Sequence, residues 1–177
     1  FAEGKQTVDE VPLSRLIGPA VVVDVSEQAA TDRDYQVTVQ DFESWEAENG
    51  QLPDRVIVLI RTGYGKYWPD REKYMGTAER GAEAVAKLHF PGLHPDAAQW
   101  LVDNRAISSI GLDTPSIDYG QSTGFESHRI LFEQNIPAFE NLANLDVLPN
   151  TGFEVVALPM NISGGSGGPR RIVAIVP

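Results

Sequence analysis

Residues 18–25, GPAVVVDV, form a continuous apolar run that Gly18 and Pro19 open and Ser26 follows. A run of this length, rich in valine and bounded by turn-forming residues, predicts a strand that is buried on both faces. The chain is therefore expected to build its core around a β-sheet that includes these residues.

Helices and further apolar runs alternate along the rest of the chain. Thr38 and Asp41 are expected to form a capping box that begins a helix, and Asn49 with Gly50 is expected to end it. Pro95 is expected to open a second helix. The inward-facing residues of that helix are expected to be Ala97, Ala98, Leu101 and Val102. The further predicted strands are Val56–Ile60, Ile107–Leu112, Val155–Leu158 and Ile172–Val176. This alternation predicts a single α/β domain over residues 1–177.

The segment from Gly63 to Ala78 has neither a helical nor a strand period and is rich in tyrosine, tryptophan, glycine and proline. It is expected to be a long loop, and long loops inside compact domains are usually functional. Its aromatic side chains either form a small satellite cluster or provide a flat apolar pocket for an aromatic substrate. The residues expected to bind such a substrate are Tyr64, Tyr67, Trp68, His89 and Phe90. His94 is instead expected to cap the helix that Pro95 opens.

The composition excludes several classes of function. Acidic residues outnumber basic ones by 25 to 14, so the net charge is −11 and nucleic-acid binding is not expected. No apolar run approaches the roughly 20 residues that a helix needs to cross a bilayer, so no membrane partner is expected. The chain has no cysteine, which excludes disulfides and thiolate metal ligands. A cytoplasmic location is expected, with a periplasmic or secreted one left open because a trimmed N-terminus would not show a signal peptide.

Polar side chains gather after the apolar run Ile107–Leu112. Asp113 and Asp118 follow it closely, and His128 and Glu140 lie further on, twelve residues apart. An imidazole and a carboxylate after the carboxyl end of a strand suit a divalent metal site in an α/β protein. The alternative is that His128 merely packs or caps on a helix surface and that Glu140 is the exposed side of a helix. If the pair binds a metal, a ring nitrogen and a carboxylate oxygen should lie within roughly 3–4.5 Å of each other.

Three other features have two interpretations each. Asp113 and Asp118 either form caps and turns after the strand or support a metal-bound histidine through its far nitrogen. The segment Gly164–Pro169, GGSGGP, has the composition of a phosphate-binding loop. It lacks the Lys-Ser/Thr ending of such loops and precedes an apolar run rather than a helix, so a tight turn is predicted in preference to a nucleotide site.

Five short blocks together point to a protein family. They are Pro12–Ser26 (PLSRLIGPAVVVDVS), Arg61–Trp68 (RTGYGKYW), Phe90–Leu101 (FPGLHPDAAQWL), GLDTPSID at 111–118 with His128 and Glu140, and Gly164–Arg171 (GGSGGPRR). In these blocks and in their order the sequence resembles the cyclase family of metal-dependent hydrolases, which includes bacterial kynurenine formamidase and isatin hydrolase. The blocks extend over nearly the whole chain, so the resemblance is specific.

The resemblance implies a mixed β-sheet flanked by helices and an enzyme that hydrolyses a non-peptide C–N bond. The implied substrate is a small aromatic amide, either an aryl formamide such as N-formylkynurenine or a cyclic amide such as isatin. His128 and Glu140 match two metal ligands of the family, and zinc and manganese both accept such ligands. The resemblance also implies a homodimer or homotetramer in which aromatic side chains of a neighbouring subunit often lie near the site.

One part of the family pattern, the N-terminal signature HxGTHxDxPxH, does not occur in these residues. In the family, two of its histidines and its aspartate bind the metal, and its last histidine transfers protons. The residues that follow the signature resemble Phe1-Ala2-Glu3-Gly4, so the general acid–base histidine is expected just before Phe1. Because a catalytic zinc needs about three protein ligands and this chain offers two, we expect the chain alone to be inactive. The alternative is a non-catalytic, metal-poor binding or structural subunit of the same fold.

Overall fold

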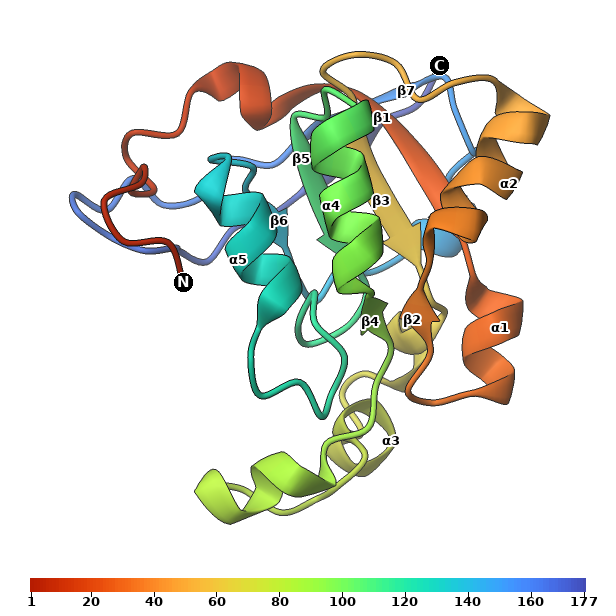
Figure 1. Ribbon diagram of the computed structural model, residues 1–177, viewed down its shortest axis with the longest axis vertical. Coiled ribbons are helices and arrows are strands. Elements are labelled where there is room, and N and C mark those ends of the chain that lie inside the picture. The colour runs from red at the N-terminus through yellow and green to blue at the C-terminus, as the bar shows by residue number, and fades with distance from the viewer.

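Six strands form one mixed sheet in the computed structural model, which describes residues 1–177 (Figure 1). Their order across the sheet is β6-β5-β3-β1-β7-β8. The strands are β1 (Ile17–Asp24), β3 (Ile57–Arg61), β5 (Ser109–Leu112), β6 (Ala138–Phe139), β7 (Phe153–Val156) and β8 (Val173–Ile175). A separate parallel pair is formed by β2 (Gln36–Val37) and β4 (Gly92–Leu93). The α/β class and the mixed sheet expected from the sequence are confirmed.

Strands β1, β3, β5 and β6 run parallel to one another, whereas β7 and β8 are antiparallel to their neighbours. In register, Ala20 lies opposite Ile57 and Val58 lies opposite Ile110. The carboxyl ends of parallel strands meet at one edge of a sheet. The residues that follow β3, β5 and β6 are therefore brought to the same edge.

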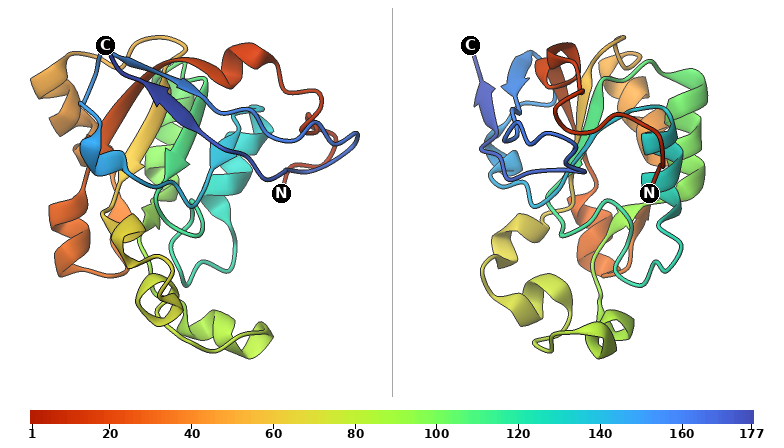
Figure 2. Two further views of the ribbon diagram at one scale, coloured as in Figure 1. Left: turned by 180° about the vertical axis from the view of Figure 1, so that it is seen from behind. Right: turned by 90° about the vertical axis from the view of Figure 1, so that its left-hand side faces the viewer.

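Three helices cover one face of the sheet (Figures 1 and 2). They are α2 (Val39–Asn49), α4 (Pro95–Asn104) and α5 (Glu126–Glu133). Alternate strand residues such as Val21, Val58 and Ile110 form a common core with Leu101 of α4 and Leu131 of α5. Burial of these apolar side chains stabilises the layer of helices on the sheet.

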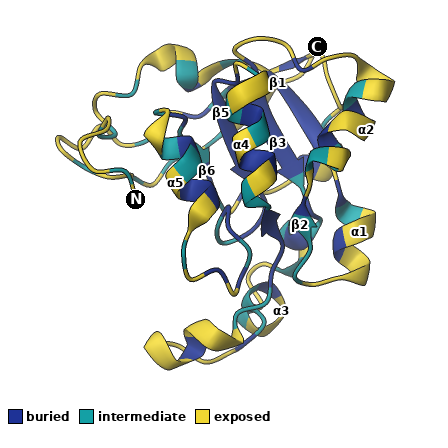
Figure 3. Ribbon diagram, in the orientation of Figure 1, coloured by how far each residue is buried: buried dark blue, intermediate teal, exposed yellow.

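The remaining strand residues face the opposite side of the sheet. Val22 and Leu59 pack there with Phe139 and Phe153, and with Leu145 of the 3-10 helix η4 (Leu145–Val147). Figure 3 shows the central strands buried and the surrounding helices exposed on their outer surfaces. Because both faces are covered, the central strands need apolar residues at every position, which explains the continuous run in β1.

The helix boundaries follow from local signals in the sequence. The backbone N–H of Thr38 donates to Asp41 Oδ2 at 2.7 Å in the expected capping box, and α2 ends before Gly50, whose φ is 86°. His94 caps α4, because its Nδ1 accepts a hydrogen bond at 3.1 Å from a backbone N–H of the first turn. These predictions are confirmed. None of the helices combines the length and apolar character that a membrane span requires.

The prediction that Gly63–Ala78 is a loop without regular structure is wrong. The segment contains the 3-10 helix η2 (Tyr64–Tyr67) and the helix α3 (Arg71–Met75), and another 3-10 helix, η3 (Ala82–Lys87), follows it. Together they project from the sheet as a separate arm (Figure 1). Asp70 caps α3 by accepting from a backbone N–H at 3.2 Å, and Gly76 ends it with φ of 88°. Helices this short are fixed by their end residues and are too brief to show an apolar period.

Two further short helical elements lie earlier in the chain. They are the 3-10 helix η1 (Leu13–Arg15) and the helix α1 (Ser26–Thr31).

Close packing of β5 against the layer behind it can be tested at Gly111. A Cβ at this position would lie 2.7 Å from Leu142 Cδ1 and 3.0 Å from Phe139 Cβ. We expect Gly111→Ala to lower the free energy of unfolding by about 1–3 kcal/mol through overpacking, measured by urea denaturation. Gly167→Ala is the matched control, since no atom lies within 4 Å of its added Cβ. Equal stability of the two variants would contradict the packing described here.

Candidate functional site

His128 lies in the first turn of α5, and its side chain is buried. Asp118, in the segment between β5 and α5, accepts hydrogen bonds from the backbone N–H groups of Ser127 at 3.0 Å and His128 at 3.3 Å. The Asp118 carboxylate also makes a very short contact with Nδ1 of the His128 ring. One carboxylate therefore accepts hydrogen bonds from two backbone N–H groups in the first turn of α5 and also fixes the orientation of the imidazole.

Glu140 follows β6 directly and reaches the imidazole from the other side. Its Oε1 lies 3.1 Å from Nε2 of His128 and 3.4 Å from the backbone nitrogen of Ile117. The convergence of His128 and Glu140 expected from the sequence is confirmed by this distance. The assignment of both residues as metal ligands stays a prediction.

The imidazole of His128 is held between two carboxylates. Burial alone lowers the pKa of His128, but the hydrogen bonds to Asp118 and Glu140 outweigh it, and the pKa is raised above its usual value. A carboxylate behind one ring nitrogen also determines which nitrogen carries the proton of the neutral ring. In the protonated ring Nε2–H donates to Glu140 Oε1, whereas in the neutral ring with its proton on Nδ1 the lone pair of Nε2 is free to bind a metal.

The donor set fits part of a divalent metal site. Nε2 of His128 and the Glu140 carboxylate are nitrogen and oxygen donors of the kind that zinc and manganese accept. No group of three or more histidine, cysteine, aspartate or glutamate side chains that could hold a metal ion occurs in residues 1–177. These residues therefore supply two candidate ligands, with Asp118 as the support for one of them.

Asp113 follows β5 and joins the ends of two neighbouring strands. Its Oδ1 accepts from the backbone N–H of Thr62 at 2.8 Å and from Thr62 Oγ1 at 2.6 Å, while its Oδ2 accepts from the N–H of Gly63 at 2.9 Å. Burial raises the pKa of Asp113, and these hydrogen bonds oppose the rise. None of its hydrogen bonds reaches His128, so of the two aspartates predicted to support the site only Asp118 contacts the imidazole.

A cavity of about 600 Å³ opens beside His128 and Glu140. Phe1 and Phe132 pack against the imidazole with ring centroids 4.5 Å and 5.2 Å away. Phe139 and Arg170 line the same cavity. The sequence analysis did not single out Phe132, Phe139 or Arg170. Phe132 could have been found from its spacing, because residues four apart share one face of a helix.

The aromatic residues predicted to bind substrate do not line this cavity. Tyr64 and Phe90 are buried in a separate cluster with Tyr74. Tyr67 packs edge-on against Tyr64 with ring centroids 5.2 Å apart. Tyr64 and Phe90 thus have a packing role, and their part in substrate binding stays a prediction.

Trp68 and His89 also lie outside the cavity of their own chain. Trp68 is 69% exposed and meets Tyr74 edge-on with ring centroids 5.6 Å apart. His89 Nδ1 lies 2.7 Å from Asp34 Oδ2, which ties the arm to the segment before β2. The structure therefore does not bring these side chains to His128, and any role in binding needs a different arrangement.

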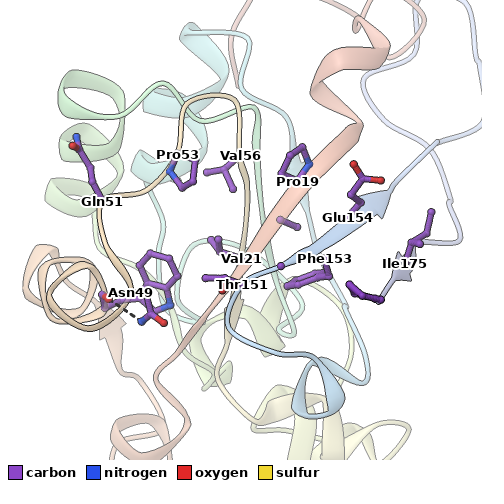
Figure 4. Close-up of a pocket in the computed structure, with 14 residues that line it drawn as sticks. Pro19, Val21, Asn49, Gln51, Pro53, Val56, Thr151, Phe153, Glu154 and Ile175 are labelled. Atoms are coloured by element: carbon purple, nitrogen blue, oxygen red, sulfur yellow. Dashed lines mark hydrogen bonds between the residues drawn. The ribbon is translucent and has the colours of Figure 1, made fainter.

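A second cavity, of about 440 Å³, lies at the opposite end of the parallel strands (Figure 4). Pro19 and Val56, near the amino ends of β1 and β3, line it together with Thr151 and Phe153. It contains no histidine, and Glu154 is its single acidic side chain. No acid–base pair or set of metal ligands converges there, so the cavity beside His128 is the candidate site.

A family model described as "Putative cyclase" matches residues 1–119. The isatin hydrolase of Roseibium aggregatum is 34% identical over 173 residues, which cover 96% of this chain and 63% of that protein. The kynurenine formamidase of Salinibacter ruber is 31% identical over 170 residues, which cover 95% of this chain and 67% of that protein. The matched family region includes Asp113 and Asp118, whereas His128 and Glu140 lie beyond it.

Solved structures show the same architecture. Isatin hydrolase A from Labrenzia aggregata, bound to benzyl benzoate, superposes with a TM-score of 0.88 and 33% identity, covering 98% of this chain and 66% of that one. An isatin hydrolase bound to the product analogue thioisatinate gives a TM-score of 0.87 and 33% identity, covering 100% of this chain and 66% of that one. The chain thus spans slightly less than two thirds of the isatin hydrolases that it matches, with 63% of the length in the Roseibium protein.

The hydrogen bonds by which Asp113 joins the ends of β3 and β5 can be tested with Asp113→Asn. In this variant one side-chain oxygen becomes an NH₂ group, which cannot accept from both Thr62 and Gly63. We expect the free energy of unfolding to fall by about 1–3 kcal/mol, because a buried donor is left unsatisfied. Asp54→Asn, at an exposed position, is the control and should leave urea denaturation nearly unchanged. A stable Asp113→Asn variant would show that this carboxylate does not hold the strand ends together.

Proposed function

The chain belongs to the cyclase family, and from that membership we propose that the protein is a metal-dependent hydrolase of a non-peptide C–N bond. The proposed substrate is a small aromatic amide, either an aryl formamide of the N-formylkynurenine kind or a cyclic amide of the isatin kind. Relatives named isatin hydrolase and kynurenine formamidase support this choice. The observation that carries the proposal is the 3.1 Å approach of His128 Nε2 to Glu140 Oε1, with Asp118 behind the ring.

We propose that His128 and Glu140 hold zinc or manganese through Nε2 and the carboxylate. When bound, the metal would lower the pKa of a coordinated water towards ~7 and polarise the carbonyl of the substrate. Asp118 accepts a hydrogen bond from Nδ1–H of His128, which leaves Nε2 as the ring nitrogen that could bind the metal. Asp113 acts at a distance, by holding the ends of β3 and β5 in register.

The walls of the cavity suit the rest of an aromatic substrate. Phe132 and Phe139 present apolar rings beside the His128–Glu140 pair. Aromatic faces of this kind bind a planar ring and exclude bulk water. Exclusion of water strengthens the interaction of a charged donor or acceptor with the reacting carbonyl.

We also propose that the protein forms a homodimer or homotetramer. Strand β8 lies at the edge of the sheet, and Val173, Ile175 and Val176 on and after it are exposed. Apolar side chains at an exposed edge are typical of surfaces that another chain covers. The resemblance to a family in which a neighbour's aromatic side chains lie near the site would account for the exposure of Trp68 and for its predicted role in ring binding.

Replacement of either proposed ligand should abolish metal binding while the protein stays folded. For His128→Ala and Glu140→Gln we expect the Kd for Mn²⁺ or Zn²⁺, measured by calorimetry, to rise by about 100-fold or more. In a protein that also carries the N-terminal signature, hydrolysis of N-formylkynurenine and isatin should fall with it, because both functions use the same pair.

Two matched variants serve as controls for that experiment. His94→Asn keeps a side chain able to cap α4, and Glu133→Gln changes an exposed carboxylate on α5. Neither should change the Kd for metal. Normal metal affinity in both His128→Ala and Glu140→Gln would refute the ligand assignment. Metal binding without hydrolysis of either substrate, in a protein that also carries the N-terminal signature, would favour a non-catalytic binding protein.

If Trp68 binds the aromatic ring of the substrate, its replacement should weaken substrate binding without lowering the stability of the fold. Because Trp68 is 69% exposed, Trp68→Ala should hardly change the melting temperature. In a protein that also carries the N-terminal signature, we expect it to raise KM for the aromatic substrate by roughly 10-fold, as the loss of a ring contact would. Val147→Ala, which removes another exposed apolar side chain, is the control. A stability loss of about 3–5 kcal/mol with unchanged KM would instead show that Trp68 belongs to the core.

A further inference from the structure

Arg170 lies where the long connection between β7 and β8 closes on itself. Pro159 and Arg170 form an isolated antiparallel bridge, and the N–H of Met160 donates to the carbonyl of Pro169 at 3.2 Å. This connection lies beside the N-terminal segment in both views of Figure 2, and Gly165 O accepts from the N–H of Val8 at 2.8 Å. Backbone contacts therefore fix the position from which the Arg170 side chain extends.

The side chain of Arg170 lies over β6, next to Glu140. Its Nη2 donates to the carbonyl oxygen of Ala138 at 3.1 Å. Its Cζ lies 4.4 Å from the centroid of the Phe139 ring. Burial lowers the pKa of Arg170, and the charge of Glu140 opposes this effect. A guanidinium remains charged at neutral pH despite such a shift, so Arg170 places a fixed positive charge in the wall of the cavity.

The guanidinium of Arg170 has unused hydrogen-bond donors. It carries five N–H donors in a planar fork, whereas the hydrogen bond to Ala138 is the one that it makes within the chain. Its Nε is buried and has no partner. A buried donor without a partner is costly. A planar ligand that accepts two parallel hydrogen bonds, such as a carboxylate, would satisfy the donors of Nη1 and Nη2 that Ala138 does not use.

The charge of the cavity differs from that of the chain as a whole. The chain carries a net charge of −11, yet the lining of the cavity includes two basic side chains, Lys5 and Arg170, and one acidic side chain, Glu140. An excess of positive charge in a concave site attracts anions. With the rings of Phe132 and Phe139 in the same wall, the site combines affinity for an anion with affinity for an aromatic ring.

We propose that Arg170 is a specificity-determining residue that binds the carboxylate of an aromatic carboxylate in the cavity of His128 and Glu140. The inference rests on the proposed function and deepens it. Hydrolysis of a cyclic aryl amide breaks the C–N bond and joins the oxygen of water to the carbonyl carbon. One proton of the water goes to the nitrogen and the other is released, which leaves an aryl amine that bears a carboxylate. Arg170 recognises this product class and strengthens its binding relative to that of an uncharged amide of the same shape.

The test compares an anionic probe with an uncharged one of similar shape. The Kd values of 2-aminobenzoate and 2-aminobenzamide are measured by calorimetry for the wild type, Arg170→Met and Arg170→Lys, with and without Mn²⁺. Arg170→Met should weaken binding of the acid by about 10-fold or more and leave binding of the amide within about 2-fold. Arg170→Lys should weaken binding of the acid less, because an ammonium keeps the charge and loses the planar fork. Arg171→Met, at the exposed neighbouring position, is the matched control and should bind both probes as the wild type does.

Three results would overturn the inference. They are unchanged binding of the acid in Arg170→Met, equal weakening of acid and amide, and the same loss in Arg171→Met. If Arg170→Met does not fold, Arg170→Lys decides the question, because it retains the aliphatic stem and the charge. An unchanged ratio of acid to amide affinity in that variant would also overturn the inference. The Mn²⁺ affinity of the wild type tests the proposed function separately, since the probes are compared in the absence of metal as well.

Discussion

Parallel pairing of β1, β3, β5 and β6 brings their carboxyl ends to one edge of the sheet, and the candidate site depends on this arrangement. Both faces of these strands are buried, so a polar side chain within a strand would be left without partners. The first positions that tolerate polar groups are the ones just beyond the strands. Thr62, Asp113 and Glu140 occupy three of them. The functional groups thus lie at this edge because the strands themselves must carry apolar residues on both buried faces.

Buried carboxylates at this edge accept hydrogen bonds from backbone N–H groups, and neither Asp113 nor Asp118 pairs with a lysine or arginine. Asp113 accepts from Thr62 and Gly63, and Asp118 accepts from Ser127 and His128. Backbone donors are held by the fold itself, so no flexible side chain has to be ordered to provide them. The charged side chains Lys5, Glu140 and Arg170 instead line the cavity.

The sequence predicted the elements whose signals are local. The run in β1, the capping box of Thr38 and Asp41, and the cap formed by His94 all depend on residues a few positions apart. The strand β6, with two residues, and the short helices between Gly63 and Ala78 have no such signal, because tertiary contacts and end residues fix them. The convergence of His128 and Glu140 was predicted through resemblance to a family, since a spacing of twelve residues does not determine a distance. Arg170 is thirty positions from Glu140 in the chain and is brought against β6 by the closure of a loop, which no sequence pattern indicated.

The dual contact of Asp118, with the first amides of α5 and with the His128 ring, couples the site to the opening of a helix. When the first turn of α5 frays, the imidazole loses its orientation at the same moment, because one carboxylate holds both. The fraction of molecules with a correctly aligned imidazole is then set by the local opening equilibrium of this turn. Any ligand that binds only the aligned imidazole shifts that equilibrium towards the closed helix. Hydrogen exchange at the amides of Ser127 and His128 therefore reports the occupancy of a cavity that lies on the other side of the ring.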